Sequence, residues 1–157
     1  MGLTRLAAFD DALMAAGVGD FNLVRLSSVI PPGARLEKVG AADQISGEHG
    51  DLLFCVYADA YASTPGEEAW AGVSWAQRED GSGGGLFVEH GGASRAGVER
   101  DLRHSLEAIS DRRRLGYRPG GQVVASAVCR DHPVCAVVMA TYRRMSWATQ
   151  WNDEDSV

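Results

Sequence analysis

The stretch 22–33 constrains the fold most, because it prescribes an extended segment followed by an enforced bend. Apolar residues are interspersed with polar ones up to a pair of serines, Ser27 and Ser28. Two further residues separate this pair from two consecutive prolines, Pro31 and Pro32. A proline fixes its own φ and supplies no amide hydrogen, so it cannot continue a strand ladder. We therefore predict a strand over residues 21–30 that runs into a rigid bend.

Adjacent serines in this position have two interpretations. In the simpler one, Ser27 and Ser28 hydrogen-bond the backbone ahead of the turn. In the other, a serine hydroxyl attacks the strained peptide bond that precedes it and converts the amide into an ester. Elimination of that ester leaves dehydroalanine, which loses ammonia to become an N-terminal pyruvoyl group. Strain is often stored at functional sites, but the local chemistry alone favours the simpler interpretation.

Composition sets the outer limits of what the chain does. Its 157 residues suit one domain with a real core, and 45% hydrophobic against 23% charged residues is ordinary globular composition. The net charge of −6 argues against nucleic acid or an anionic membrane as a partner. It mildly favours a cationic substrate, although negative charge also serves solubility alone.

The cysteines and the apolar runs indicate where the protein works. Cys55, Cys129 and Cys135 are odd in number, lie in apolar surroundings and show no metal-ligand spacing. We expect reduced core thiols in a cytoplasmic protein and no metal site. The N-terminus lacks a signal-length apolar stretch, and no run of about 18 apolar residues occurs, so a soluble protein is expected.

The N-terminal region predicts a helix over residues 5–16. Thr4 can cap its start, and Gly17 can end it in a left-handed turn. Asp10 borders the apolar stripe, so its carboxylate is either half solvated or paired with a buried cation. Helical spacing selects the buried stripe as Leu6, Phe9, Leu13 and Ala16.

The rest of the chain alternates apolar runs with glycine-rich loops. We predict one further helix and several strands, which group into an α+β class. The expected strands are 34–39, 52–58, 70–77 and 86–90, the helix is 94–115, and segments 122–129 and 134–142 form an antiparallel hairpin.

Residues 8–13 and 17–32 resemble the start of the pyruvoyl-dependent arginine decarboxylases, which make agmatine and carbon dioxide from arginine. The likeness continues through Pro65-Gly66-Glu67, the run 71–73, the run 85–89 and the closing strands. The segment from the asparagine at 22 to the proline pair is its most specific part. The resemblance implies a four-layer αββα sandwich that assembles as a homotrimer or a dimer of trimers, with active sites between subunits.

For the chemistry, the resemblance implies that Ser28 becomes the pyruvoyl group of a chain 28–157, with residues 1–27 as the other product. The ketone of that group condenses with the substrate amine and takes up the electron pair left by carbon dioxide. Neither pyridoxal phosphate nor a metal is implied. Ser27 supplies the carbonyl that is attacked, and its hydroxyl helps to hold the oxyanion.

Five further positions match functional residues of that family. Asn22 lies six residues before Ser28, so on one strand it would share its face and donate to the oxyanion. Glu89 matches the general acid that returns a proton to the α-carbon, a task that requires apolar surroundings. The alternative for Asn22 is an edge-strand amide bonded to a neighbouring loop, and without the resemblance a surface glutamate would be the better interpretation of Glu89. Asp10 matches the partner of the substrate guanidinium, whereas Leu13 and Phe87 match the lining of the arginine pocket.

Two departures leave alternatives open. Phe87 is bulkier than the aliphatic residue common at its position, and Asp20 stands where an amide is common. The same chemistry on lysine or ornithine is therefore a second hypothesis. A trimeric binding or structural homologue that does not mature is a third.

Overall fold

The computed structural model describes residues 3–40, 45–113 and 116–147, and these contain two helices and seven strands. The elements are α1 (Arg5–Ala15), β1 (Asn22–Arg25), β2 (Val29–Ile30), β3 (Leu52–Ala62), β4 (Glu68–Arg78), β5 (Gly85–Gly92), α2 (Arg95–Arg112), β6 (Tyr117–Val128) and β7 (Val134–Met145).

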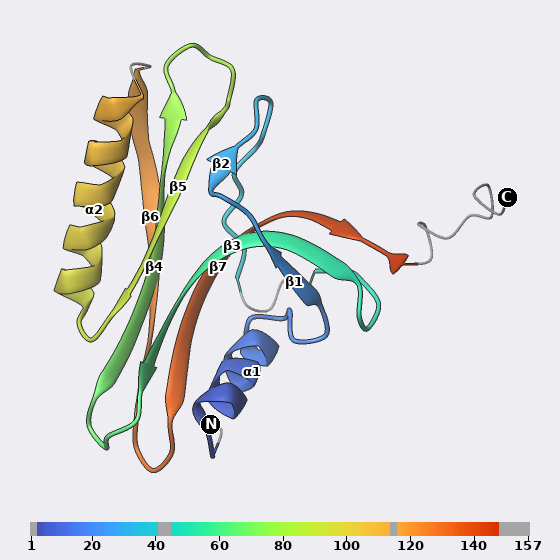
Figure 1. The fold of residues 1–157 in the computed structure, drawn as a ribbon, viewed down its shortest axis with the longest axis vertical. Coiled ribbons are helices and arrows are strands. Elements are labelled where there is room, and N and C mark those ends of the chain that lie inside the picture. Colours follow the sequence, from blue (N-terminus) through green and yellow to red (C-terminus); the bar gives the residue numbers. More distant parts are fainter. Residues whose placement is uncertain (1–2, 41–44, 114–115, 148–157) are drawn as a thin grey trace, which may run out of the picture.

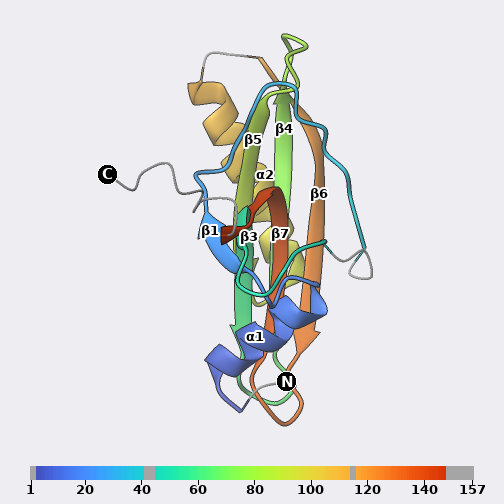
Figure 2. The same ribbon diagram turned by 90° about the vertical axis from the view of Figure 1, so that its right-hand side faces the viewer.

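The strands form two sheets, with the orders β1-β3-β7 and β2-β5-β4-β6. The sheets pack face to face, α2 covers the outside of the four-stranded sheet, and α1 packs on the three-stranded one (Figure 1). Turning the molecule by 90° shows the long strands of the two sheets overlapping along most of their length (Figure 2). The predicted α+β class is confirmed, and the layers form a sandwich of the expected kind.

Helix α1 begins and ends as predicted, but its buried face is rotated. The amide of Ala7 donates to the Thr4 hydroxyl at 3.1 Å, and Gly17 has a left-handed φ of 73°. Leu13 is buried, whereas Leu6 is 78% exposed, so its assignment to the core is wrong. Ala8 is buried instead, and the predicted Phe9 and Ala16 do pack with Leu13 against the core.

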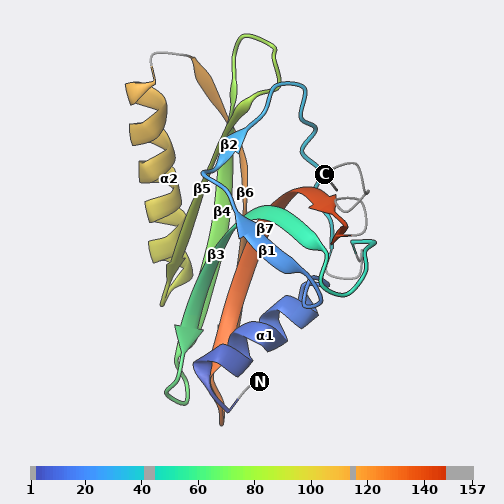
Figure 3. The ribbon, with the colours of Figure 1, turned by 45° about the vertical axis from the view of Figure 1, so that its right-hand side comes forward.

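The predicted single strand 21–30 is wrong, because the chain changes sheets in its middle. β1 pairs in parallel with β3, and β2 pairs antiparallel with β5. The amide of Leu26 still donates to the Cys55 carbonyl of β3 at 2.9 Å. Two residues later, the Ser28 carbonyl accepts from the Phe87 amide of β5 at 2.8 Å. The two serines therefore lie at the crossing between the sheets (Figure 3).

Strand β4 separates two layers of core, and its side chains alternate between them. Val73 and Trp75 face the other sheet, whereas Trp70 and Ala76 pack in the layer under α2. Gly72 also faces α2, because a Cβ built there would lie 2.8 Å from the Leu102 side chain. The alternation fixes the helix against the sheet that carries Ser28.

Three predicted elements need correction. Residues 34–39 form no strand and run beside the opening between the sheets. β6 and β7 are not a hairpin, because β6 pairs with β4 and β7 pairs with β3. The turn between them carries the chain from one sheet to the other, and a local turn signal cannot distinguish these outcomes. Helix α2 ends at Arg112, and the last two residues of its predicted span, 114–115, lie outside the described residues.

The three cysteines are buried free thiols, as predicted. Within the described ranges, neither helix has the length and apolar character needed to cross a membrane.

Candidate active site

Ser28 has an unusual backbone conformation. Its φ is +65°, and among the described residues it is the one non-glycine residue with a positive φ. For an L-residue other than glycine, this left-handed region costs about 1–2 kcal/mol. The strain is maintained because residue 26 is hydrogen-bonded to one sheet and residue 28 to the other.

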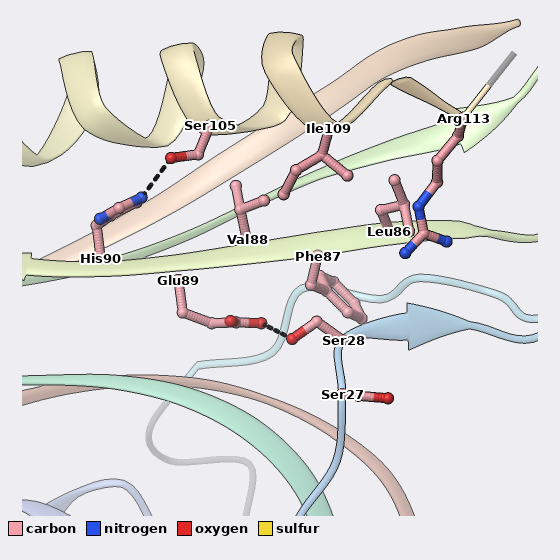
Figure 4. Close-up of a pocket in the computed structure, with 10 residues that line it drawn as sticks. All are labelled: Ser27, Ser28, Leu86, Phe87, Val88, Glu89, His90, Ser105, Ile109 and Arg113. Atoms are coloured by element: carbon pink, nitrogen blue, oxygen red, sulfur yellow. Dashed lines mark hydrogen bonds between the residues drawn. The ribbon is translucent and has the colours of Figure 1, made fainter. Parts of the chain in front are cut away.

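The Ser28 hydroxyl donates a hydrogen bond to Oε1 of Glu89 at 2.6 Å (Figure 4). Glu89 lies in the middle of β5, and its side chain points to the same side of the strand as Phe87. The next residue, His90, points the opposite way and bonds the hydroxyl of Ser105 on α2 at 2.7 Å. Strand alternation thus presents the carboxylate, rather than the imidazole, to the serine.

A cavity of about 290 Å³ opens beside this pair. Among the described residues that line it, Glu89 is the one acidic residue, and Arg113 brings a positive charge from the end of α2. The remaining lining residues are Ser27, Ser28, Leu86, Phe87, Val88, His90, Ser105 and Ile109.

Phe87 lines the cavity, and Tyr142 packs against its ring behind the cavity wall. Phe87 is 7% exposed, and its ring meets the edge of the Tyr142 ring at a centroid distance of 6.0 Å. The Tyr142 hydroxyl is buried and has no hydrogen-bond partner within the described part of the chain. Burial, with a smaller contribution from the charge of Glu89, raises the pKa of Tyr142 to about 12.

The structure brings Ser27, Ser28, Phe87 and Glu89 together, but not the other predicted residues. Asp10 is exposed on α1, and neither it nor Leu13 lines the cavity. Leu13 instead packs in a separate cluster with buried residues of the three-stranded sheet side, Val18 and Leu53.

Asn22 does not share a strand face with Ser28, because the strand is interrupted between them. Its side-chain amide donates to the Gly50 carbonyl at 2.7 Å on the three-stranded sheet side. The geometric argument that placed Asn22 beside Ser28 within one chain is therefore wrong, whereas its catalytic role stays a prediction.

Sequence reasoning did not find Tyr142 or Arg113. Tyr142 continues the alternating series of β7 that faces the other sheet, and in sequence this reads as ordinary core. Arg113 fits a helix end, where positive charge suits the helix dipole. Strand pairing and sheet packing bring Tyr142 near Glu89, whereas the packing of α2 on the sheet brings Arg113 to the cavity.

The fold and the site define an α+β sandwich of two sheets. In it, a strained serine on the segment that crosses between the sheets is hydrogen-bonded to a carboxylate. A family model described as "Pyruvoyl-dependent arginine decarboxylase (PvlArgDC)" matches residues 2–145. The chain therefore belongs to the pyruvoyl-dependent arginine decarboxylase family.

Individual relatives agree with this assignment. The pyruvoyl-dependent arginine decarboxylase of Thermococcus sibiricus is 33% identical over 90% of this chain and 89% of its own length. The Thermococcus kodakarensis protein of the same name is 33% identical over 88% and 85%. Pyruvoyl-dependent arginine decarboxylase 2 of Archaeoglobus fulgidus is 36% identical over 66% of each chain. The chain is thus a member of a family of carboxy-lyases.

Ser28 and its surroundings are compatible with a pyruvoyl group at this position. Ser28 supplies the hydroxyl, the strained backbone and a hydrogen-bonded carboxylate in one place. Within the described residues, no group of three or more histidine, cysteine or acidic side chains is arranged to hold a metal ion.

Proposed function

We propose that the chain is a precursor that cleaves its own Ser27–Ser28 bond and then decarboxylates L-arginine to agmatine. The observation that carries the proposal is the hydrogen bond of 2.6 Å from the Ser28 hydroxyl to Glu89, made by a residue with a left-handed φ of 65°. A nucleophile beside a base, at a strained peptide, is the arrangement that activates a serine hydroxyl.

In cleavage, Glu89 takes the hydroxyl proton while Oγ of Ser28 bonds to the carbonyl carbon of Ser27. The C–N bond then breaks, and the amide becomes an ester with a free amine on residue 28. Removal of the Cα proton of residue 28 breaks its Cβ–Oγ bond, so that Oγ departs with the Ser27 carboxylate. The dehydroalanine left on residue 28 is an enamine, and transfer of a proton to its Cβ gives an imine. One water molecule hydrolyses this imine, releasing ammonia and leaving the ketone on a chain of residues 28–157.

The surrounding backbone holds both sides of the scissile bond. Leu26 is fixed by its hydrogen bond to Cys55, and Ser28 by its hydrogen bond to Phe87. Attack on the Ser27 carbonyl releases the strain that these two anchors impose. The Ser27 hydroxyl, which borders the same cavity, and the side-chain amide of Asn22 are our candidates for holding the oxyanion.

In the mature enzyme, the pyruvoyl group supplies the electron sink for loss of carbon dioxide. Glu89, which lies beside residue 28, is our candidate for returning a proton to the α-carbon of the product. Phe87 screens this position from water on the inner side, since it is almost fully buried. Apolar surroundings of this kind favour proton delivery by a carboxylic acid.

Recognition of the substrate guanidinium calls for a second subunit. The cavity beside Ser28 contains no carboxylate other than Glu89, so within the described residues of one chain it lacks an anionic partner for a guanidinium. Asp10 is exposed on α1 among large apolar side chains that are themselves exposed: Leu3, Leu6 and Met14. A second copy seated on this surface would bury them and bring Asp10 to the site.

We therefore propose a homotrimer, or a dimer of trimers, in which Asp10 of one copy completes the cavity beside Ser28 of the next, while Leu13 stays buried in the core of its own chain. A carboxylate meets a guanidinium through two parallel hydrogen bonds, which selects charge and shape together. The net charge of −6 is compatible with a cationic substrate.

The test is carbon dioxide release from a panel of arginine, lysine, ornithine and a neutral amino acid, measured with the purified, processed protein. We expect arginine to have the highest kcat/KM. Preference for lysine or ornithine would show that the bulk of Phe87 shortens the pocket and would replace the substrate in this proposal. Absence of release from every amino acid would favour a binding or structural role.

A further inference from the structure

Tyr142 carries a polar group that the fold leaves unused. Its hydroxyl is fully buried and unpaired within the described chain. Buried tyrosine hydroxyls normally find a partner, so an unpaired one at a functional site calls for an explanation. This hydroxyl lies within electrostatic reach of Glu89.

The position of Tyr142 on β7 is specified by an irregularity. Cys55 pairs with Thr141 and Phe54 with Arg143, so Tyr142 is the extra residue of a β-bulge. Bulges redirect side chains and are frequent beside active sites. The ring of Tyr142 faces the other sheet and contacts Phe87, which lies on the same side of β5 as Glu89.

The cleavage chemistry gives this hydroxyl a use. In the precursor, Glu89 accepts a hydrogen bond from Ser28. Cleavage by the proposed function, on which this inference rests, transfers the oxygen of that hydroxyl to the carboxylate of Ser27. The carboxyl group of Glu89 then loses this hydrogen bond at the moment when it must be oriented for proton delivery.

We propose that Tyr142 is a positioning residue, whose hydroxyl donates to one oxygen of Glu89 after cleavage and leaves the other oxygen directed at the substrate α-carbon. Tyr142 remains a neutral donor throughout the working range, because its pKa is raised to about 12. Cys55 on β3 and residue 28 are the other groups near this pair, whereas His90 lies on the opposite face of β5.

The test is Tyr142→Phe, which removes one oxygen atom, compared with Tyr61→Phe as a matched control on β3. Each is measured for completeness of cleavage, thermal midpoint, and kcat and KM with arginine. For Tyr142→Phe we expect normal cleavage, an unchanged or slightly higher thermal midpoint, and kcat lowered about tenfold with little change in KM. For Tyr61→Phe, whose hydroxyl is hydrogen-bonded to Asp59, we expect wild-type cleavage, kcat and KM, and a lower thermal midpoint.

Two further readouts separate positioning from structure. The basic limb of the kcat/KM profile should move to higher pH in Tyr142→Phe, because a donated hydrogen bond stabilises an ionised carboxyl group more than a neutral one. Added to Glu89→Gln, with kcat expressed per processed chain because that variant cleaves slowly, Tyr142→Phe should lower kcat by less than about twofold, since the tyrosine acts through the carboxyl group.

An active wild type with unaltered kcat in Tyr142→Phe would overturn this inference alone. A Tyr142→Phe chain that melts several degrees lower and fails to cleave would also overturn it, because the hydroxyl would then be structural. A wild type that releases no carbon dioxide would instead overturn the proposed function itself, and that result precedes any comparison of variants.

Discussion

Leu26 and Ser28 are two residues apart, yet their backbones hydrogen-bond to different sheets. The Leu26 amide donates to Cys55 on β3 at 2.9 Å, and the Ser28 carbonyl accepts from Phe87 on β5 at 2.8 Å. The peptide bond between the two serines therefore spans the gap between two rigid layers. This explains why Ser28 is held at a φ that a serine seldom adopts.

The strain at Ser28 predicts a difference between two substitutions that both abolish cleavage. Ser28→Gly should be more stable than Ser28→Ala by about 1 kcal/mol, because glycine adopts a positive φ without steric cost. Both variants lose the hydrogen bond to Glu89, so the comparison isolates the energetic cost of the backbone conformation at position 28. Chemical denaturation of the two intact precursors measures the difference in their free energies of unfolding. Equal free energies would mean that position 28 is unstrained.

Glu89→Gln should slow cleavage by about a hundredfold or more, because an amide cannot take the proton of the Ser28 hydroxyl. The rate is followed as loss of intact precursor by mass spectrometry. Glu99→Gln is the matched control, since Glu99 pairs with Arg95 on the exposed surface of α2. A Glu89→Gln precursor that cleaves at the wild-type rate would show that Glu89 takes no part in self-cleavage.

Mixed assemblies test whether the site is shared between copies. Asp10→Asn alone should bind arginine poorly, and Ser28→Ala alone should be inactive. Co-expressed, they should recover a substantial fraction of wild-type activity, because some interfaces then combine an intact Asp10 with an intact Ser28. Activity no higher than the sum of the two single variants would place both residues in one chain's site.

The ion pair between buried Asp51 and the exposed Arg144 predicts a stability that depends on pH. Asp51 accepts hydrogen bonds from the Glu48 amide and from the Arg144 guanidinium, and these hold its pKa below the usual 3.8. The pKa of Asp51 is lower in the folded protein than in the unfolded chain. The stabilisation is therefore present at neutral pH and is lost as the pH falls through the folded pKa.

Asp51→Asn should therefore lower the thermal midpoint at pH 7, and the difference from wild type should shrink as the pH approaches 3. Scanning calorimetry of both proteins across this range measures it. A deficit that stays constant from pH 7 to pH 3 would show that the charge of Asp51 contributes nothing.

The helices and most strands could be predicted because their signals are local. Thr4 and Ser94 cap helices as their sequences indicate, and the two faces of β4 follow from simple alternation. The errors arose where the partner of a strand mattered. Nothing local distinguishes a hairpin between residues 122–129 and 134–142 from a crossing between two sheets.

The residues of the site also differ in how well they could be predicted from the sequence. Ser27, Ser28, Phe87 and Glu89 were predicted through resemblance, and the fold brings them to one cavity. Asn22 was placed beside Ser28 by counting along a strand that is in fact interrupted. Tyr142 carries no local signal, because only the pairing of β7 with β3 and the packing of the two sheets bring it near Glu89.

The intact mass of purified, aged protein, taken with and without borohydride, tests the central claim most directly. The account predicts two polypeptides, residues 1–27 and 28–157, of which the longer has a blocked N-terminus and gains two hydrogen atoms on reduction. A single unmodified chain of 157 residues that borohydride leaves unchanged would contradict it.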